Sequence, residues 1–241
     1  MGNRSLQTTF CLFLLSYCLT NIYCDPVRNP DNPIINYLQQ AEDFAEIYNG
    51  RMEALYNITQ YKNLPYYKNS DFTEASIVYK NIYYPNQKVR LDLFKEQLIL
   101  LPPKKQFGIV LNFQKVEKVD MYSKTFVRLI PPPESGLKPG FYIRLFDKEK
   151  IKLYRKEHFS IQPIELIYYG FDLGIRFYLY YNNRYYPVKN KGSFSKLFPQ
   201  YKKQINKFAK DNKLNFKENP DESLTALADY CEKLISSTNK L

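Results

Sequence analysis

The clearest pattern in the chain is an alternation of apolar and polar residues between positions 141 and 189. The segments FYIRLF (141–146) and IKLYRK (151–156) each alternate, and the polar DKEK (147–150) separates them. Successive side chains of a strand point to opposite faces of a sheet. A period of two on both sides of a short polar turn therefore predicts a β-hairpin.

A second hairpin is predicted directly after the first. IRFYLYY (175–181) and RYYPVK (184–189) are separated only by Asn182 and Asn183. Asparagine tolerates the positive φ angles that a two-residue hairpin turn requires. Because parallel strands need a long crossover connection, two hairpins this close together indicate an antiparallel sheet.

Upstream of the hairpins, short apolar runs alternate with turn-like or charged residues. The strand-like runs are SIVYK (76–80), VRLDLF (89–94), QLILL (97–101), FGIVLNF (107–113) and TFVRLI (125–130). Runs this closely spaced predict a meander. We interpret PPPESG (131–136) as a long loop within one domain and not as a domain boundary, because neither side of it alone holds the five or so strands of a typical stable sheet. Gly170 and Gly174 are interpreted as a bend or bulge between strands.

Three stretches have helical spacing instead. The first, over 33–49, begins with proline and is followed by Gly50. The second, over 199–214, is rich in lysine and carries an apolar stripe. The third begins with Asn219 as N-cap and Pro220 as first helical residue, and has the cleanest buried face.

The predicted fold is mainly β with helices (β + α). We expect an antiparallel meander, sandwich or partly open barrel of about eight to ten strands, with one N-terminal helix and two C-terminal helices. The chain contains 23 Tyr and no Trp, and tyrosine suits strands whose rings are buried while the hydroxyls reach water. The expected division is a signal peptide at 1–24, a β domain with its N-terminal helix at 25–192, and a helical segment packed on the sheet at 193–241.

The beginning of the chain has the composition of a secretory signal. Arg4 is followed by an apolar run over 10–15, and no further charge occurs before Asp25. The apolar stretch is too short and too poorly flanked for a stable membrane span. We therefore expect export to the periplasm or outer membrane, with no transmembrane span in the mature chain. Lipid attachment at Cys24 is the alternative to ordinary cleavage near residues 20–24.

The residues that most often carry catalysis are scarce. Three of the four cysteines lie in the expected leader, and Cys231 falls on the apolar face of the last helix, where we expect a small buried hydrophobe. His158 is the only histidine and follows Glu157, so we expect it to be exposed on the surface. Histidine-rich metal sites are thereby excluded, and no phosphate-binding or calcium-binding loop occurs. We predict that the protein binds no cofactor and no metal and that it is not an enzyme.

A pair of carboxylates could still support glycoside cleavage. The candidates are Asp120, Asp147, Glu149, Glu165 and Asp172. Nearly all of them are predicted to lie in turns or beside basic residues, where a solvated carboxylate is the default. The absence of Trp also weakens a sugar-cleaving function.

Charge is the strongest functional signal. The net charge is +11, and residues 184–217 hold ten basic side chains against the single acid Asp211. The candidate residues for binding an anionic surface are Lys196, Lys202, Lys203, Lys207, Lys210 and Lys213. A basic helical face can bind anionic lipid, lipopolysaccharide or an acidic protein. Alternatively, it only makes the protein soluble. Export argues against a nucleic-acid partner.

Several segments together resemble a group of uncharacterised exported proteins of Bacteroidetes-type bacteria. They are Tyr48-Asn49-Gly50, Pro65-Tyr66-Tyr67, the strand pair 89–100, the hairpin 141–156 and the run 178–214. The resemblance covers nearly all of the mature chain and consists of aromatic and hydrophobic patterning. It implies a Gram-negative envelope location and nothing catalytic, since the group has no assigned activity. The turn DKEK departs from the glycine-containing turn expected of such proteins.

The function predicted from the sequence is that of a non-catalytic envelope protein. It would act as a binding or interaction scaffold through sheet edges, tyrosine-rich faces or the basic helix, with an envelope protein or an anionic envelope surface as partner. The first alternative is a carrier that encloses an apolar ligand in a curved sheet. The second is a glycan-active enzyme.

Overall fold

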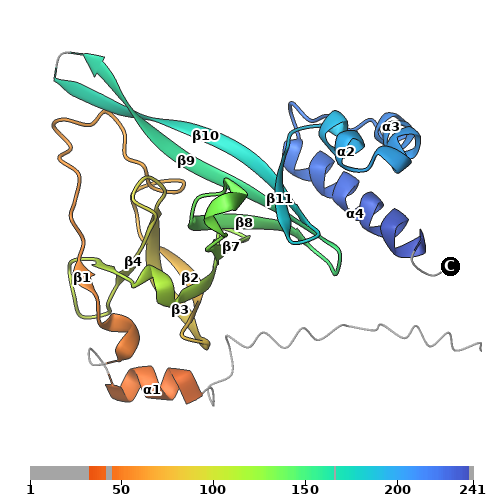
Figure 1. The fold of residues 1–241 in the computed structure, drawn as a ribbon. Coiled ribbons are helices and arrows are strands. Elements are labelled where there is room, and N and C mark those ends of the chain that lie inside the picture. Colours follow the sequence, from red (N-terminus) through yellow and green to blue (C-terminus); the bar gives the residue numbers. More distant parts are fainter. Residues whose placement is uncertain (1–32, 42–44, 166, 239–241) are drawn as a thin grey trace, which may run out of the picture.

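A computed structural model describes residues 33–41, 45–165 and 167–238 (Figure 1). All its named strands join in one antiparallel sheet of 11 strands, in the order β1-β5-β4-β3-β2-β6-β7-β8-β9-β10-β11. The strands are β1 (Arg51–Met52), β2 (Thr73–Tyr79), β3 (Ile82–Asp92), β4 (Gln97–Leu101), β5 (Ile109–Val110), β6 (Val116–Met121), β7 (Lys124–Leu129), β8 (Gly140–Asp147), β9 (Ile151–Glu165), β10 (Tyr168–Tyr181) and β11 (Arg184–Val188). The mainly antiparallel β prediction is confirmed. The sheet is single and open, so a sandwich or barrel is not confirmed.

Within the described ranges, four α-helices flank the two ends of the sheet. They are α1 (Pro33–Ala41), α2 (Lys191–Leu197), α3 (Lys202–Asp211) and α4 (Pro220–Thr238). Short 3-10 helices are η3 (Glu46–Tyr48), η4 (Phe113–Lys115), η5 (Pro133–Ser135) and η6 (Pro199–Tyr201). Figure 1 shows α1 beside the β2–β4 end, while α2, α3 and α4 gather beyond β11 at the other end. None of the described helices is long and apolar enough to cross a membrane.

The helix predictions need two corrections. A continuous helix over 33–49 is wrong, because Ala45 has an extended backbone (φ −57°, ψ 138°) before η3; residues 42–44 lie outside the described part. The C-terminal segment, as far as it is described, holds three α-helices in place of the two predicted. The additional one, α2, is capped by Asn190, whose Oδ1 accepts a hydrogen bond from the Ser193 backbone N–H at 3.2 Å.

Both predicted hairpins are confirmed. Strand β8 pairs with β9, and β10 pairs with β11. Asn182 and Asn183 form the second turn with φ angles of 47° and 59°, as the sequence predicts.

The strands also differ from the prediction in number and length. The described residues form eleven strands where eight to ten were expected, because β1 and β6 were both missed, and β5 is shorter than the predicted run over 107–113. Strands β9 and β10 are much longer than predicted and pair from Ile151 to Glu165, with one register shift opposite Tyr168 and Tyr169. Gly170 and Gly174 therefore lie inside β10, so a bend or bulge between two strands is wrong at these positions, although the pairing with β9 shifts register between Tyr168 and Tyr169, just before Gly170.

Two clusters of buried side chains make up most of the core. The first includes Ile77 and Leu91 and packs beneath α1 and η3. The second joins β9–β11 to α2–α4 and includes Leu153, Leu227 and Cys231. Cys231 is fully buried, as predicted, and burial raises the pKa of its thiol to about 12. The predicted signal peptide, with Cys11, Cys18 and Cys24, lies outside the described residues.

Candidate functional site

A cavity of about 410 Å³ lies between strands β9 and β10, the turn that joins β3 to β4, and the loop before β8. Its volume falls within the range of small-molecule sites, roughly 300–1,000 Å³. The lining residues are Leu93, Phe94, Glu96, Gly136, Lys138, Pro139, Tyr142, Lys156, His158, Phe159, Arg176 and Tyr178. We call this space the β9–β10 cavity.

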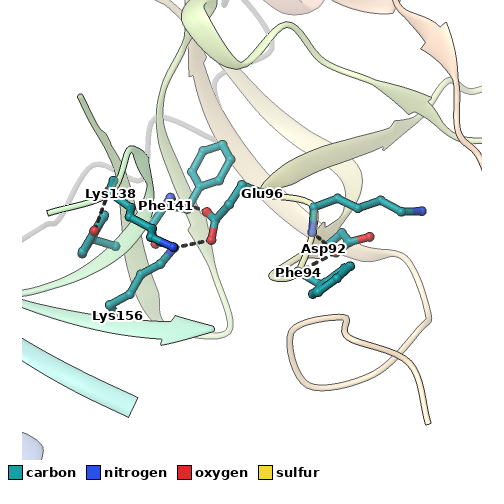
Figure 2. Close-up of polar contacts among 8 residues, drawn as sticks. Asp92, Phe94, Glu96, Lys138, Phe141 and Lys156 are labelled. Carbon is teal, nitrogen blue, oxygen red and sulfur yellow. Dashed lines mark hydrogen bonds and ion pairs between the residues drawn. The ribbon is translucent and has the colours of Figure 1, made fainter. Parts of the chain in front are cut away.

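An ion pair between Glu96 and Lys156 forms one wall of the β9–β10 cavity (Figure 2). The Lys156 ammonium also donates to the Phe141 carbonyl at 2.9 Å and lies 4.8 Å from the centroid of the Tyr142 ring. The second carboxylate oxygen of Glu96 accepts the Phe141 backbone N–H at 2.8 Å. A Cβ atom on Gly140 would come within 2.6 Å of Glu96 Oε2 and 2.8 Å of Lys156 Nζ, so any larger residue there would displace the pair from this position.

Burial acts on both members of this pair. It raises the pKa of Glu96, and Lys156 only partly offsets the rise. It lowers the pKa of Lys156, again with partial compensation by Glu96. Both directions agree that removal from water outweighs the mutual attraction, as is common for buried ion pairs.

A second buried carboxylate fixes the turn that carries Glu96. Asp92, at the end of β3, accepts the backbone N–H groups of Phe94 and Lys95 at 2.9 and 2.8 Å (Figure 2). It also accepts the hydroxyl of Tyr56 at 2.8 Å. Burial raises the pKa of Asp92, since it is only 2% exposed. These bonds hold Glu96 in place at a positive φ of 53°.

Three basic side chains on the rim and wall of the β9–β10 cavity have no polar partner. Within the described part of the chain, the side chains of Lys138, His158 and Arg176 form no hydrogen bond and no ion pair. His158 is partly buried, in contrast to the exposed position expected from the sequence. Burial lowers the pKa of His158, and the positive charges of Arg176, Lys156 and Lys138 lower it further.

The register of the β9–β10 hairpin explains this gathering of charge. Lys156 lies opposite Arg176, and His158 lies opposite Gly174. Residues two apart on a strand share a face, so Lys156 and His158 point to the same side. The site was not predicted from the sequence, because the predicted first strand ends at residue 156, before His158, and the predicted second strand begins only at residue 175. The sequence signal that could have indicated this site is the spacing of Lys156 and His158, two basic residues two positions apart on one strand.

The six lysines predicted to bind an anionic surface are placed on α2, on α3 and just beyond it. They are Lys196, Lys202, Lys203, Lys207, Lys210 and Lys213, and all six are exposed. We call them the basic helical surface. Among the residues described, none of the six forms an ion pair. Some basic residues of the sheet are paired instead, since Arg144 contacts Asp147 at 3.0 Å and Arg155 contacts Asp221 at 2.8 Å.

A hollow of about 490 Å³ opens beside the basic helical surface. It is lined by Asn190, Lys191, Gly192, Ser195, Lys196, Lys202, Asn206 and Phe216. The Ser195 hydroxyl is buried and finds no hydrogen-bond partner among the described residues. Cationic side chains and an unsatisfied hydroxyl together favour an anionic, hydrogen-bonding group in this hollow.

The five carboxylate candidates are not brought together in the β9–β10 cavity. Asp120 lines a separate hollow of about 390 Å³ with Glu74, but it accepts the Thr125 hydroxyl at 2.6 Å and pairs with Lys118 at 2.8 Å. The other four lie at the ends or along the exposed part of the two hairpins: Asp147, Glu149, Glu165 and Asp172. Over the described ranges, no group of three or more His, Cys, Asp or Glu side chains could hold a metal ion.

No family model, no curated protein and no solved structure matches this chain. Its function is therefore argued from its own residues. The two features that distinguish it chemically are the basic helical surface and the cationic β9–β10 cavity.

Proposed function

We propose that the protein is a non-catalytic binding protein of the cell envelope, and that it attaches to an anionic lipid surface through the basic helical surface. The observation that carries the proposal is the concentration of exposed lysines on α2, on α3 and just beyond it. The lysines of α2 and α3 are exposed without ion pairs in the described part of the chain, whereas Arg144, Arg155 and Lys156 are each paired with an acid.

The packing of α3 supports attachment at the surface of a bilayer. Ile205 and Ala209 are buried against the C-terminal core, so the apolar face of α3 is already occupied. A helix that inserts into lipid needs its apolar face free. Binding would then be electrostatic, at about 1 kcal/mol for each well-placed lysine, and would decay within a Debye length of about 8 Å at physiological ionic strength.

The hollow beside Ser195 supports recognition of a headgroup in addition to simple charge attraction. Lys191, Lys196 and Lys202 surround it, and the Ser195 hydroxyl is available as a donor. A phosphate group entering this hollow would satisfy the hydroxyl and neutralise part of the positive charge. Export by the expected signal peptide would bring the chain to the same side as envelope lipids.

The test is sedimentation with phosphatidylcholine vesicles that either contain or lack phosphatidylglycerol. Replacing Lys202, Lys203, Lys207 and Lys210 by Gln should weaken binding to the anionic vesicles at least about a hundredfold, since four favourable contacts are removed. Binding of the unchanged protein should also disappear at about 0.5 M NaCl.

A matched control removes the same charge elsewhere. Lys62, Lys68, Lys88 and Lys148 are exposed outside the basic helical surface, and their replacement by Gln should leave most of the binding intact. Equal loss in the two variants would mean that only net charge matters. Unchanged binding in the first variant, or attachment only to acidic proteins, would refute a lipid-binding role for α2 and α3.

A further inference from the structure

We propose that the β9–β10 cavity binds a small organic anion, with a carboxylate or phosphate group held against Lys138, His158 and Arg176. This site is separate from the basic helical surface and does not depend on the function proposed for it. The acid that lines the cavity, Glu96, is already engaged by Lys156 and Phe141.

The charges of the cavity favour an anion. Three side chains, Lys138, His158 and Arg176, are uncommitted within the described residues, while the carboxylate of Glu96 is used on both oxygens. The positive charges of Lys138 and Arg176 repel one another, and an anion removes that repulsion, while the imidazole of His158 can donate a hydrogen bond to it. The guanidinium of Arg176 can present two parallel N–H groups to a carboxylate or phosphate, which adds geometric selectivity.

The remaining walls favour an organic ligand over a bare inorganic ion. Phe94, Phe159 and Tyr178 supply aromatic surface, and Leu93 supplies aliphatic surface. Small-molecule sites generally combine such apolar walls with a few convergent polar groups. The volume of about 410 Å³ suits a small molecule and is too small for a folded partner.

The cavity is held by contacts that exist without a ligand. Asp92 fixes the β3–β4 turn through the backbone N–H groups of Phe94 and Lys95. Gly174 leaves room for the His158 ring, because a Cβ at that position would come within 2.7 Å of the His158 Nε2 atom. A site that is already ordered loses less conformational entropy when a ligand binds.

His158 provides a single-site reporter, since it is the only histidine in the chain. The full chain, carrying a tag without histidine, would be titrated by NMR with phenyl phosphate, benzoate, inorganic phosphate and uncharged benzyl alcohol. We expect saturable shifts of the imidazole resonances with phenyl phosphate or benzoate. The bound anion should also raise the pKa of His158, because a nearby negative charge favours the imidazolium. Burial and the positive charges of Arg176, Lys156 and Lys138 lower this pKa, whereas the carboxylate of Glu96, like the anion, acts to raise it.

Two variants and one control locate the effect. Arg176→Gln and Lys138→Gln change exposed residues and should each weaken binding of the organic anion about tenfold. Arg184→Gln removes the same charge from an exposed position on β11, outside the cavity, and should leave the affinity unchanged. The variant lacking Lys202, Lys203, Lys207 and Lys210 should still bind the organic anion. A failure of the proposed anion site can therefore be told apart from a failure of the proposed lipid binding.

The outcomes decide the proposal and its chemistry. Saturation with benzoate alone identifies a carboxylate ligand, and saturation with phenyl phosphate alone identifies a phosphate ester. If benzyl alcohol caused the same shifts as the anions, the proposal that the cavity selects a negatively charged ligand would be overturned. The absence of saturable shifts with every anion, or equal weakening by Arg184→Gln, would overturn the site itself.

Discussion

At the scale of single residues, the Glu96–Lys156 pair is the most informative feature. Removal from water raises the pKa of Glu96 and lowers the pKa of Lys156. A raised acid pKa gives stability at low pH that is lost as the pH rises through the folded-state value. A lowered lysine pKa gives stability at high pH that is lost as the pH falls through it. Near neutral pH, therefore, both groups are less favourably charged in the folded protein than in water.

A double-mutant cycle tests this energetic balance. Lys156→Met and Glu96→Gln should each lower the free energy of unfolding by about 3 kcal/mol, because each leaves one buried charge without its partner. The double variant should recover to within about 1 kcal/mol of the unchanged protein, since neither charge of the pair remains and the oxygen of the introduced glutamine amide can still accept the Phe141 N–H. Urea denaturation at neutral pH measures all four proteins.

The pH dependence gives this prediction a further check. In Lys156→Met the carboxyl of Glu96 stays buried with its pKa raised, so the loss of stability should shrink as the pH falls from about 7 to about 4. Strict additivity of the two single variants would contradict a coupled pair. A loss that grows on acidification would contradict the direction assigned to Glu96.

The sequence indicated only part of this site. A strand with basic residues at positions 156 and 158 is visible in it, but the contact between Glu96 and Lys156 joins residues 60 positions apart. Such contacts depend on strand order, which local patterning does not determine. Cys231 was predictable for the opposite reason, because the helical spacing of α4 alone places it on the buried face.

At the scale of elements, the β9–β10 hairpin shows what period-2 patterning can and cannot reveal. Alternation is clear where one face is buried, as at Ile151 and Leu153, and there the strands were predicted. Further along, residues 160–165 are exposed on both faces, so the pattern disappears although the pairing continues. Strand β6 was missed for a similar reason, since Val116, Val119 and Met121 are buried without regular alternation.

The two glycines of β10 should respond differently to substitution. In Gly174→Ala the new Cβ would meet the partly buried ring of His158, and we expect a loss of about 1–3 kcal/mol in the free energy of unfolding. In Gly170→Ala the new Cβ would meet Ile164 Cδ1 at 2.6 Å, the end of a flexible and exposed side chain that can move aside.

Thermal and chemical denaturation of the two alanine variants provides the measurement. We expect Gly170→Ala to remain within about 0.5 kcal/mol of the unchanged protein, or to become slightly more stable, because alanine restricts the unfolded chain more than glycine does. The NMR signal of His158 should move only in Gly174→Ala. Equal effects at the two positions would show that the ring of His158 does not fill the space beside Gly174.

At the scale of the whole molecule, one sheet connects two cores that the sequence did not distinguish. Strand β8 contributes Phe141 and Ile143 to the first core, and Leu145 packs against both. Helix α4 is tied to the sheet by Asp221, which pairs with Arg155 on β9 at 2.8 Å. The predicted sequence of hairpins was compatible with a sandwich, a barrel or an open sheet, because closure depends on twist and strand order and not on local alternation.

This continuity predicts that the two cores unfold together. Ile77→Ala, in the first core, and Leu227→Ala, in the second, each remove a fully buried side chain and should each cost about 3 kcal/mol. Hydrogen exchange measured by mass spectrometry at increasing denaturant should show that either variant lowers protection by the same amount in β3 and in α4, since both belong to one cooperative unit. Ile167→Ala, at a position that is 68% exposed, should change neither. Loss of protection confined to α2–α4 in Leu227→Ala would show instead that the helices detach from the sheet before it unfolds.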